Sequence, residues 1–65
     1  MISEKEIYQS AAVLIREHGD DAAVVAAMKF DELIEAGDRQ GAAMWRLILE
    51  AVKKLQDTEP KGPVH

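Results

Sequence analysis

Apolar residues recur every three or four positions along three segments of this chain, a spacing typical of helices with one buried face. A glycine–aspartate pair separates each segment from the next. The apolar positions are Ile7, Ala11, Leu14 and Ile15 in the first segment; Ala23, Ala26, Ala27, Phe30, Leu33 and Ile34 in the second; and Met44, Leu47, Ile48, Ala51 and Leu55 in the third. The pattern predicts an all-α fold of three short helices in a small bundle, either as antiparallel neighbours or as a helical hairpin plus a third helix.

The two glycine–aspartate pairs mark the expected joints between helices. Glycine adopts the left-handed conformation that commonly closes a helix, so Gly19 and Gly37 are predicted to end the first and second helices. Aspartate is a preferred N-cap because its carboxylate accepts from free backbone N–H groups. We therefore expect Asp20 or Asp21 to cap the second helix and Asp38 to cap the third.

The first helix begins with a capping-box pattern, because Glu6 follows Ser3 by three residues. We expect one helical domain over residues 1–57 and a flexible tail over 58–65, which contains both prolines. The predicted helices span about residues 4–18, 21–36 and 39–56. Gly41 falls in the first turn of the third helix, where glycine costs about 1 kcal/mol relative to alanine. Either that helix begins later or, as we favour, another element packs closely against this backbone.

The third helix is apolar around about half of its circumference, more than the roughly 100° that a surface helix buries. A second apolar row overlaps the first and comprises Trp45, Ile48, Val52 and Leu55. Because two short helices leave part of this surface uncovered, we expect another polypeptide to cover it, either a second copy of the chain, which we favour, or another protein. The predicted homodimer contact joins the third helix and the alanine-rich side of the second, with anchors at Met44, Trp45, Ile48, Leu49 and Val52. Trp45 fits either this contact or the core of a single chain.

Composition narrows the class of protein. The chain has 65 residues, of which 48% are hydrophobic and 31% charged, as expected for one globular domain. It has no cysteine, so disulfides and thiolate metal sites are excluded, and stability has to come from helix packing or oligomerisation. A formal charge of −4 disfavours nucleic acid and anionic membranes as partners. We expect no signal peptide and no membrane span, and we predict a cytoplasmic protein.

Residues with catalytic or metal-binding chemistry are sparse. The two serines, Ser3 and Ser10, lie outside any G-x-S-x-G motif, and no glycine-rich phosphate loop is present. His18 stands near Asp20 and Asp21, which leaves a metal or small-ligand site as a weak alternative. A structural metal usually needs four ligands, and a histidine in the last turn of a helix also interacts favourably with the helix dipole. We therefore predict a non-enzymatic protein with no catalytic residues, cofactor or metal.

Three short helices also raise the alternative of a small helix-turn-helix DNA-binding regulator. Its recognition helix would begin at the second glycine–aspartate pair. The residues available to contact DNA are Arg39, Gln40, Arg46, Lys53 and Lys54. The acidic balance of the chain and the wide apolar arc of the third helix both argue against this function, so the interaction module is the leading hypothesis.

The segment from Ser10 to Gln56 resembles a group of small uncharacterised bacterial proteins. In that group an Ile/Leu-rich helix ends in His-Gly, an alanine-rich helix ends near a leucine, and Gly-Asp, Trp-Arg and a closing leucine follow. The matching residues are His18-Gly19, Ala22-Ala23, Ala26-Ala27, Leu33, Gly37-Asp38, Trp45-Arg46 and Leu55. The resemblance implies an all-helical domain of unknown function and transfers no catalytic residue.

Overall fold

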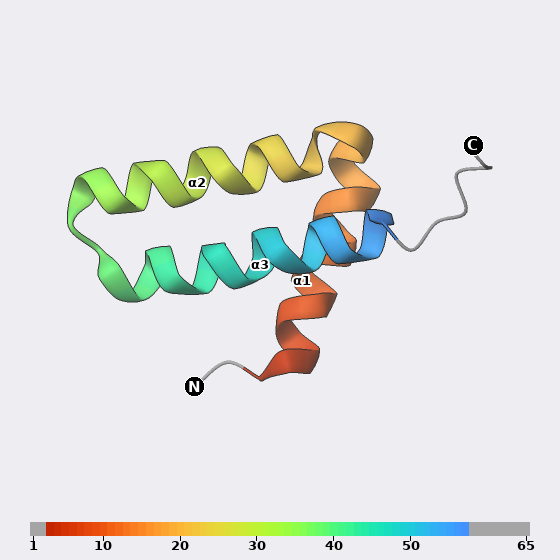
Figure 1. The fold of residues 1–65 in the computed structure, drawn as a ribbon, viewed down its shortest axis with the longest axis horizontal. Helices are drawn as coiled ribbons and strands as arrows, with labels where there is room; N and C mark the ends of the chain where they lie inside the picture. The colour runs from red at the N-terminus through yellow and green to blue at the C-terminus, as the bar shows by residue number, and fades with distance from the viewer. Residues whose placement is uncertain (1–2, 58–65) are drawn as a thin grey trace.

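The computed structural model describes residues 3–57, and the predicted flexible tail over 58–65 lies outside the described residues. The elements are helix α1 (Glu4–His18), the short 3-10 turn η1 (Gly19–Asp21), helix α2 (Ala22–Ala36) and helix α3 (Arg39–Asp57). Helices α2 and α3 lie side by side as an antiparallel hairpin, and α1 crosses one end of it (Figure 1). The predicted all-helical fold is confirmed for the described residues. The helices differ from the predicted bounds by one residue at the start of α2 and at the end of α3.

The start of α1 is closed by the predicted capping box. The Ser3 hydroxyl accepts from the Glu6 backbone N–H at 3.2 Å, and the Glu6 carboxylate accepts from the Ser3 backbone N–H at 3.4 Å. Each residue thus satisfies a backbone donor that the helix itself leaves unpaired. The sequence signal is local, and the structure confirms it.

The joint between α1 and α2 differs from the prediction. Gly19 has a positive φ of 59°, and its N–H donates to the Ile15 carbonyl, so it does end α1. Asp21, however, makes no side-chain cap hydrogen bond with α2. It already has helical backbone angles (φ −86°, ψ 0°), whereas a capping side chain needs an extended residue to reach back to the helix. The 3-10 turn that contains Asp20 leads the chain into α2 instead, and the expected aspartate cap at this joint is wrong.

The joint between α2 and α3 forms as predicted. Gly37 is left-handed (φ 80°, ψ 13°), its N–H donates to the Ile34 carbonyl at 3.1 Å, and the Asp38 N–H donates to the Leu33 carbonyl at 2.9 Å. This pair of bonds is a Schellman motif. Asp38 then caps α3, because its carboxylate accepts from the Gly41 N–H at 2.9 Å.

The same carboxylate explains the glycine in the first turn of α3. A Cβ atom added to Gly41 would lie 2.6 Å from Oδ2 of Asp38 and 3.0 Å from its Cγ. Our expectation that another element packs against this backbone is therefore corrected. The helix begins at Arg39, and the capping side chain itself occupies the space beside Gly41.

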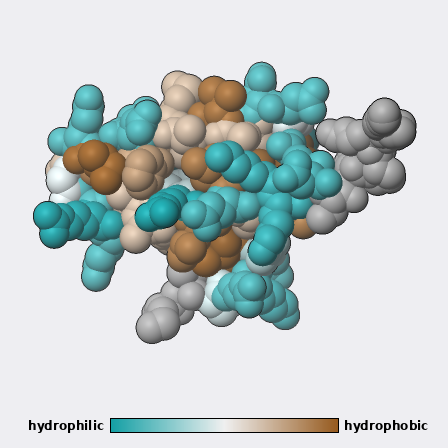
Figure 2. Space-filling model, viewed as in Figure 1, coloured by the Kyte–Doolittle hydropathy of each residue, from teal (hydrophilic) through white to brown (hydrophobic). Residues whose placement is uncertain are grey.

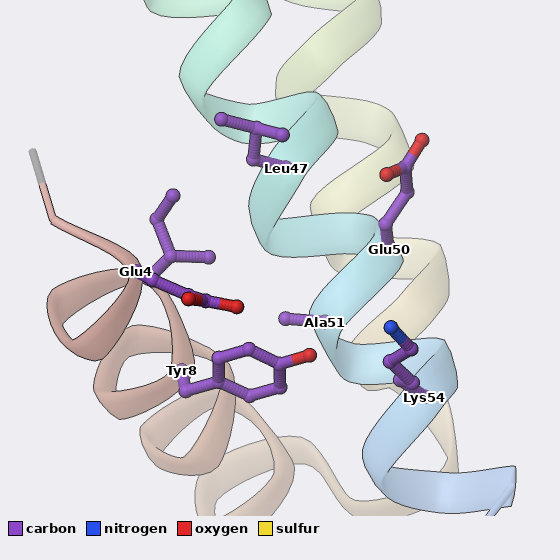
Figure 3. A pocket seen from close by; sticks show the side chains of 7 residues that line it. Glu4, Tyr8, Leu47, Glu50, Ala51 and Lys54 are labelled. Carbon is purple, nitrogen blue, oxygen red and sulfur yellow. The ribbon is translucent and has the colours of Figure 1, made fainter.

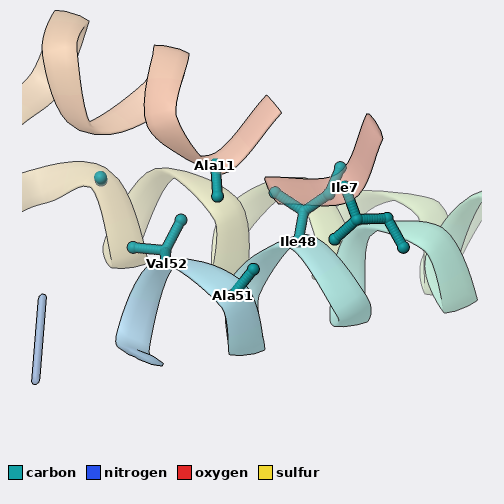
Figure 4. Packing of buried hydrophobic residues seen from close by; sticks show 6 residues of the cluster. Ile7, Ala11, Ile48, Ala51 and Val52 are labelled. Atoms are coloured by element: carbon teal, nitrogen blue, oxygen red, sulfur yellow. The ribbon is translucent and has the colours of Figure 1, made fainter. Parts of the chain in front are cut away.

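The core lies where α1 crosses the hairpin. Ile7 and Ala11 of α1 point toward residues of α3 (Figure 4). The buried cluster comprises Ile7, Ala11, Ala22, Ile48, Ala51 and Val52, and within residues 3–57 it contains no buried polar side chain. Ala26 and Ala42 are also buried, one on each helix of the hairpin. Because alanine is small, the helix backbones can approach closely at these positions, and α1 covers one end of the hairpin while leaving the other end open.

Candidate interaction surface

The five predicted anchors on α3 separate into two groups. Ile48 (3% exposed) and Val52 (0%) belong to the core of the single chain, where they pack with residues of α1. The chain itself covers both side chains almost completely, so our placement of these two on an outer surface is corrected. Met44, Trp45 and Leu49 are only partly buried. The physical reason is the crossing of α1, which covers the side of α3 that contains Ile48 and Val52.

Large apolar side chains remain exposed elsewhere. Ile34 on α2 is 52% exposed and Leu47 on α3 is 46% exposed. The full set is Val13, Val24, Met28, Ile34 and Leu47. On the face drawn in Figure 2, hydrophobic residues reach the surface between hydrophilic ones. Single exposed apolar residues are ordinary on protein surfaces, so what matters is whether some of them line one continuous surface.

Ile34 and Leu47 do share a surface. Both line an open groove of about 560 Å³ between α2 and α3. The remaining residues of the groove are Phe30, Arg39, Ala42, Ala43, Arg46 and Glu50. Arg46 and Glu50 form an exposed ion pair, with 3.5 Å between Nε and Oε2. The groove therefore combines aliphatic and aromatic side chains, two small alanines, and a charged rim on α3, and we call it the hairpin groove.

A second hollow, of about 250 Å³, adjoins the hairpin groove where α1 meets α3. Glu4 and Tyr8 reach toward it from α1, and Lys54 lies on the α3 side (Figure 3). Leu47 and Glu50 line both the hollow and the groove. The two depressions are thus neighbours on α3, and Leu47 is exposed between them.

Met44 and Trp45 line a third hollow, on a different part of α3. Its volume is about 340 Å³, and its lining is completed by Ile48 of α3 and by Ser10, Val13 and Leu14 of α1. Trp45 also packs against the buried cluster, so it serves the core of the single chain while part of it stays open. The sequence pattern placed Trp45 and Leu47 on overlapping faces of the third helix. In the structure they line different hollows, because α1 packs beside Trp45 and leaves Leu47 exposed.

The residues considered for a metal site are not brought together. Within residues 3–57, no group of three or more His, Asp or Glu side chains is arranged to hold a metal ion. His18, Asp20 and Asp21 are all exposed at the α1–α2 joint. The carbonyl of Gly19 in that joint accepts a hydrogen bond from the Gln56 side chain at 3.1 Å. That hydrogen bond holds the end of α3 against the α1–α2 joint, so the joint has a structural role.

The residues considered for DNA binding are all exposed on α3, namely Arg39, Gln40, Arg46, Lys53 and Lys54. Glu50 and Asp57 are exposed on the same helix, and Glu50 pairs with Arg46. In a helix-turn-helix motif the last two helices cross at about 90–120°. Here α2 and α3 run antiparallel in contact along the hairpin, which is a different arrangement (Figure 1).

Comparison with known families gives one result. The model of a family described as "Family of unknown function (DUF6961)" matches residues 3–59. The match confirms the expectation of a small domain of unknown function. Searches of curated proteins and of solved structures return no match. Among the described residues, no helix has both the length and the apolar character required to cross a membrane.

Proposed function

We propose that this protein, which belongs to the family of unknown function DUF6961, is a non-enzymatic helical interaction module that forms a homodimer through its hairpin groove. The proposal keeps the partner expected from the sequence and moves the contact surface. The anchors become Ile34 and Leu47, with Phe30 beside them. None of the five anchors expected from the sequence lines the hairpin groove, so they are left out of the proposed contact. The cytoplasm stays the predicted location, from the acidic, cysteine-free composition.

The observation that supports this proposal is the exposure of Ile34 and Leu47 in one groove, which no other segment of residues 3–57 covers. Burying a whole Leu or Ile side chain contributes about 1.5–3 kcal/mol, so completing the burial of these half-exposed residues contributes roughly 1 kcal/mol each. Two copies bring four such side chains together, or about 4 kcal/mol before any polar contact. A micromolar dissociation constant requires about 8 kcal/mol, and the loss of translational and rotational freedom on association opposes this burial. Polar contacts at the rim must therefore add to it, and we expect a weak dimer.

Sedimentation equilibrium tests the dimer at concentrations from about ten micromolar to about one millimolar, the range expected for a weak contact. We expect the mass of the wild-type chain to rise from 7.2 kDa toward twice that value. Leu47→Gln and Ile34→Gln each remove apolar surface from the groove and are expected to keep the chain monomeric. Val24→Gln is the matched control, because Val24 is also exposed on α2 but does not line the groove.

Two results would contradict the proposal. One is a wild-type chain that stays at 7.2 kDa throughout the concentration range. The other is a dimer that survives Leu47→Gln and Ile34→Gln as well as it survives Val24→Gln. In the second case the contact lies on another surface, with the third hollow beside Trp45 as the next to test.

The DNA-binding alternative retains one supporting observation, the exposure of its five residues along α3. A gel shift with duplex DNA at low salt separates it from the interaction module, because contacts to phosphate are strongest there. A shift that weakens as salt is added would favour the DNA-binding function. No shift at low salt would remove it.

A further inference from the structure

We infer that the two copies pair with their α3 helices antiparallel about a two-fold axis near Ala43 and Arg46, so that Arg39 of each copy faces Glu50 of the other. This inference rests on the proposed homodimer and specifies its geometry. The occupant of the hairpin groove is then the hairpin groove of a second copy. The evidence is the order of charges along the rim of the groove.

The rim of the groove on α3 is one straight stripe. Arg39, Ala43, Arg46 and Glu50 all line the groove, and all four are exposed or partly exposed. Their spacings of four, three and four residues place them on one face of the helix. Along this stripe, positive residues come first and the negative residue comes last. The two ends of the stripe therefore carry opposite charges. Whether a second helix lies parallel or antiparallel decides which charges face each other.

Parallel pairing of two such stripes would set each residue against its own copy, so arginine would face arginine and glutamate would face glutamate. Antiparallel pairing about the middle of the stripe sets Arg39 against Glu50 of the second copy, and the reverse, giving two opposite-charge contacts per dimer. It also sets each Arg46 against an alanine, Ala43 of the second copy. The opposite charges favour the antiparallel arrangement, and the like charges disfavour the parallel one. The charges on this surface therefore select antiparallel pairing.

The same register fits the apolar residues. It places Leu47 of one copy opposite Ala42 and Ala43 of the other, and those alanines are small enough to receive a leucine side chain. Each copy presents the same surface to the other, which is what a closed two-fold dimer requires. The other exposed apolar residues of α2, Val24 and Met28, do not line the groove. Their insertion into the groove of a neighbour would be a head-to-tail contact and would generate larger assemblies.

Charge reversal tests the pairing. In the antiparallel dimer, Arg39→Glu places a second carboxylate against Glu50, and Glu50→Arg places arginine against arginine. We expect each single variant to raise the dissociation constant by about tenfold, since two contacts per dimer become repulsive. The double variant Arg39→Glu/Glu50→Arg restores opposite charges only in the antiparallel arrangement. It is expected to return the dissociation constant to within about threefold of the wild-type value.

The matched controls make the same charge changes at residues outside the groove. Lys5→Glu on α1 matches Arg39→Glu, and Glu35→Arg on α2 matches Glu50→Arg; neither residue lines the groove. Both controls are expected to dimerise like the wild-type chain. Far-UV circular dichroism checks that every variant keeps its helices.

The outcomes separate the pairing geometry from the dimer itself. If the wild-type chain dimerises but the single variants match their controls, or the double variant is as weak as the singles, the antiparallel pairing is overturned and the homodimer stands. Species larger than a dimer overturn it as well. If the wild-type chain is monomeric throughout, the proposed function fails and the pairing fails with it.

Discussion

Asp38 and Gly41 form a coupled pair at the start of α3. The Asp38 carboxylate accepts from the Gly41 N–H and also fills the space that a Cβ at Gly41 would enter. Asp38→Ala removes the cap and is expected to cost about 1 kcal/mol of unfolding free energy. Gly41→Ala would gain about 1 kcal/mol of helix propensity, but only if the carboxylate moves aside and weakens the cap.

The coupling is measurable by a double-mutant cycle in urea. We expect Gly41→Ala to be close to neutral in the wild-type chain and to stabilise the Asp38→Ala variant by about 1 kcal/mol, because the carboxylate is then gone. Equal effects of Gly41→Ala in both backgrounds would contradict this account. Equal effects would mean that the Asp38 carboxylate can move away from the added Cβ and still cap the helix.

Cap residues were also what the sequence predicted best. Ser3, Gly37 and Asp38 act on neighbours within a few residues, so their chemistry is decided locally and can be recognised in the sequence. Asp21 does not cap α2, because it lies in the 3-10 turn and has the backbone angles of that turn. Two consecutive aspartates after a glycine are compatible with either geometry, and the sequence contains nothing that selects between them.

At the scale of elements, the packing of α1 against the hairpin depends on a small residue at Ala11, which is fully buried. A leucine there has no space, and overpacking typically costs about 1–3 kcal/mol. For a chain of this size that is a large share of the total stability, which seldom exceeds about 3–5 kcal/mol. We therefore expect Ala11→Leu to lower the midpoint of thermal unfolding sharply.

The neighbouring residue supplies the control. Ala12 is exposed on the same helix, so Ala12→Leu is expected to change the unfolding free energy by less than about 0.5 kcal/mol. Thermal unfolding followed by circular dichroism measures both variants at the same low concentration. If Ala11→Leu were as harmless as Ala12→Leu, α1 would not be packed tightly across the hairpin.

Helix faces were predicted less well than helix ends, and α3 shows why. Leu47 and Ile48 are adjacent in the sequence and both follow helical spacing, yet Ile48 is core and Leu47 is exposed. Periodicity shows that a helix has a wide apolar arc, but the side covered by α1 depends on how α1 crosses the hairpin. That crossing is a tertiary feature, so the sequence indicated an uncovered surface on α3 without showing which residues form it.

At the scale of the whole molecule, the net negative charge of the chain opposes dimerisation. Each copy carries a formal charge of −4, so two copies repel at long range. A specific contact therefore needs local complementarity, and the hairpin groove offers it through Arg39 and Arg46, two of the eight basic residues of the chain. The same rim supplies Glu50, and a surface with both signs of charge can pair with itself.

A dimer that stabilises such a small fold makes its stability depend on protein concentration. Where the dimer predominates, a tenfold rise in concentration contributes about 0.7 kcal/mol per chain, which for a domain of this size raises the unfolding midpoint by roughly 3–5 °C. We expect that rise for the wild-type chain and for Val24→Gln. For Leu47→Gln we expect a midpoint that is independent of concentration and a few degrees below that of the dilute wild-type chain, because about half of Leu47 is already buried in the single subunit. A Leu47→Gln midpoint that still rises with concentration would show that the dimer does not need Leu47, and a wild-type midpoint that ignores concentration would mean that the groove is left open to water.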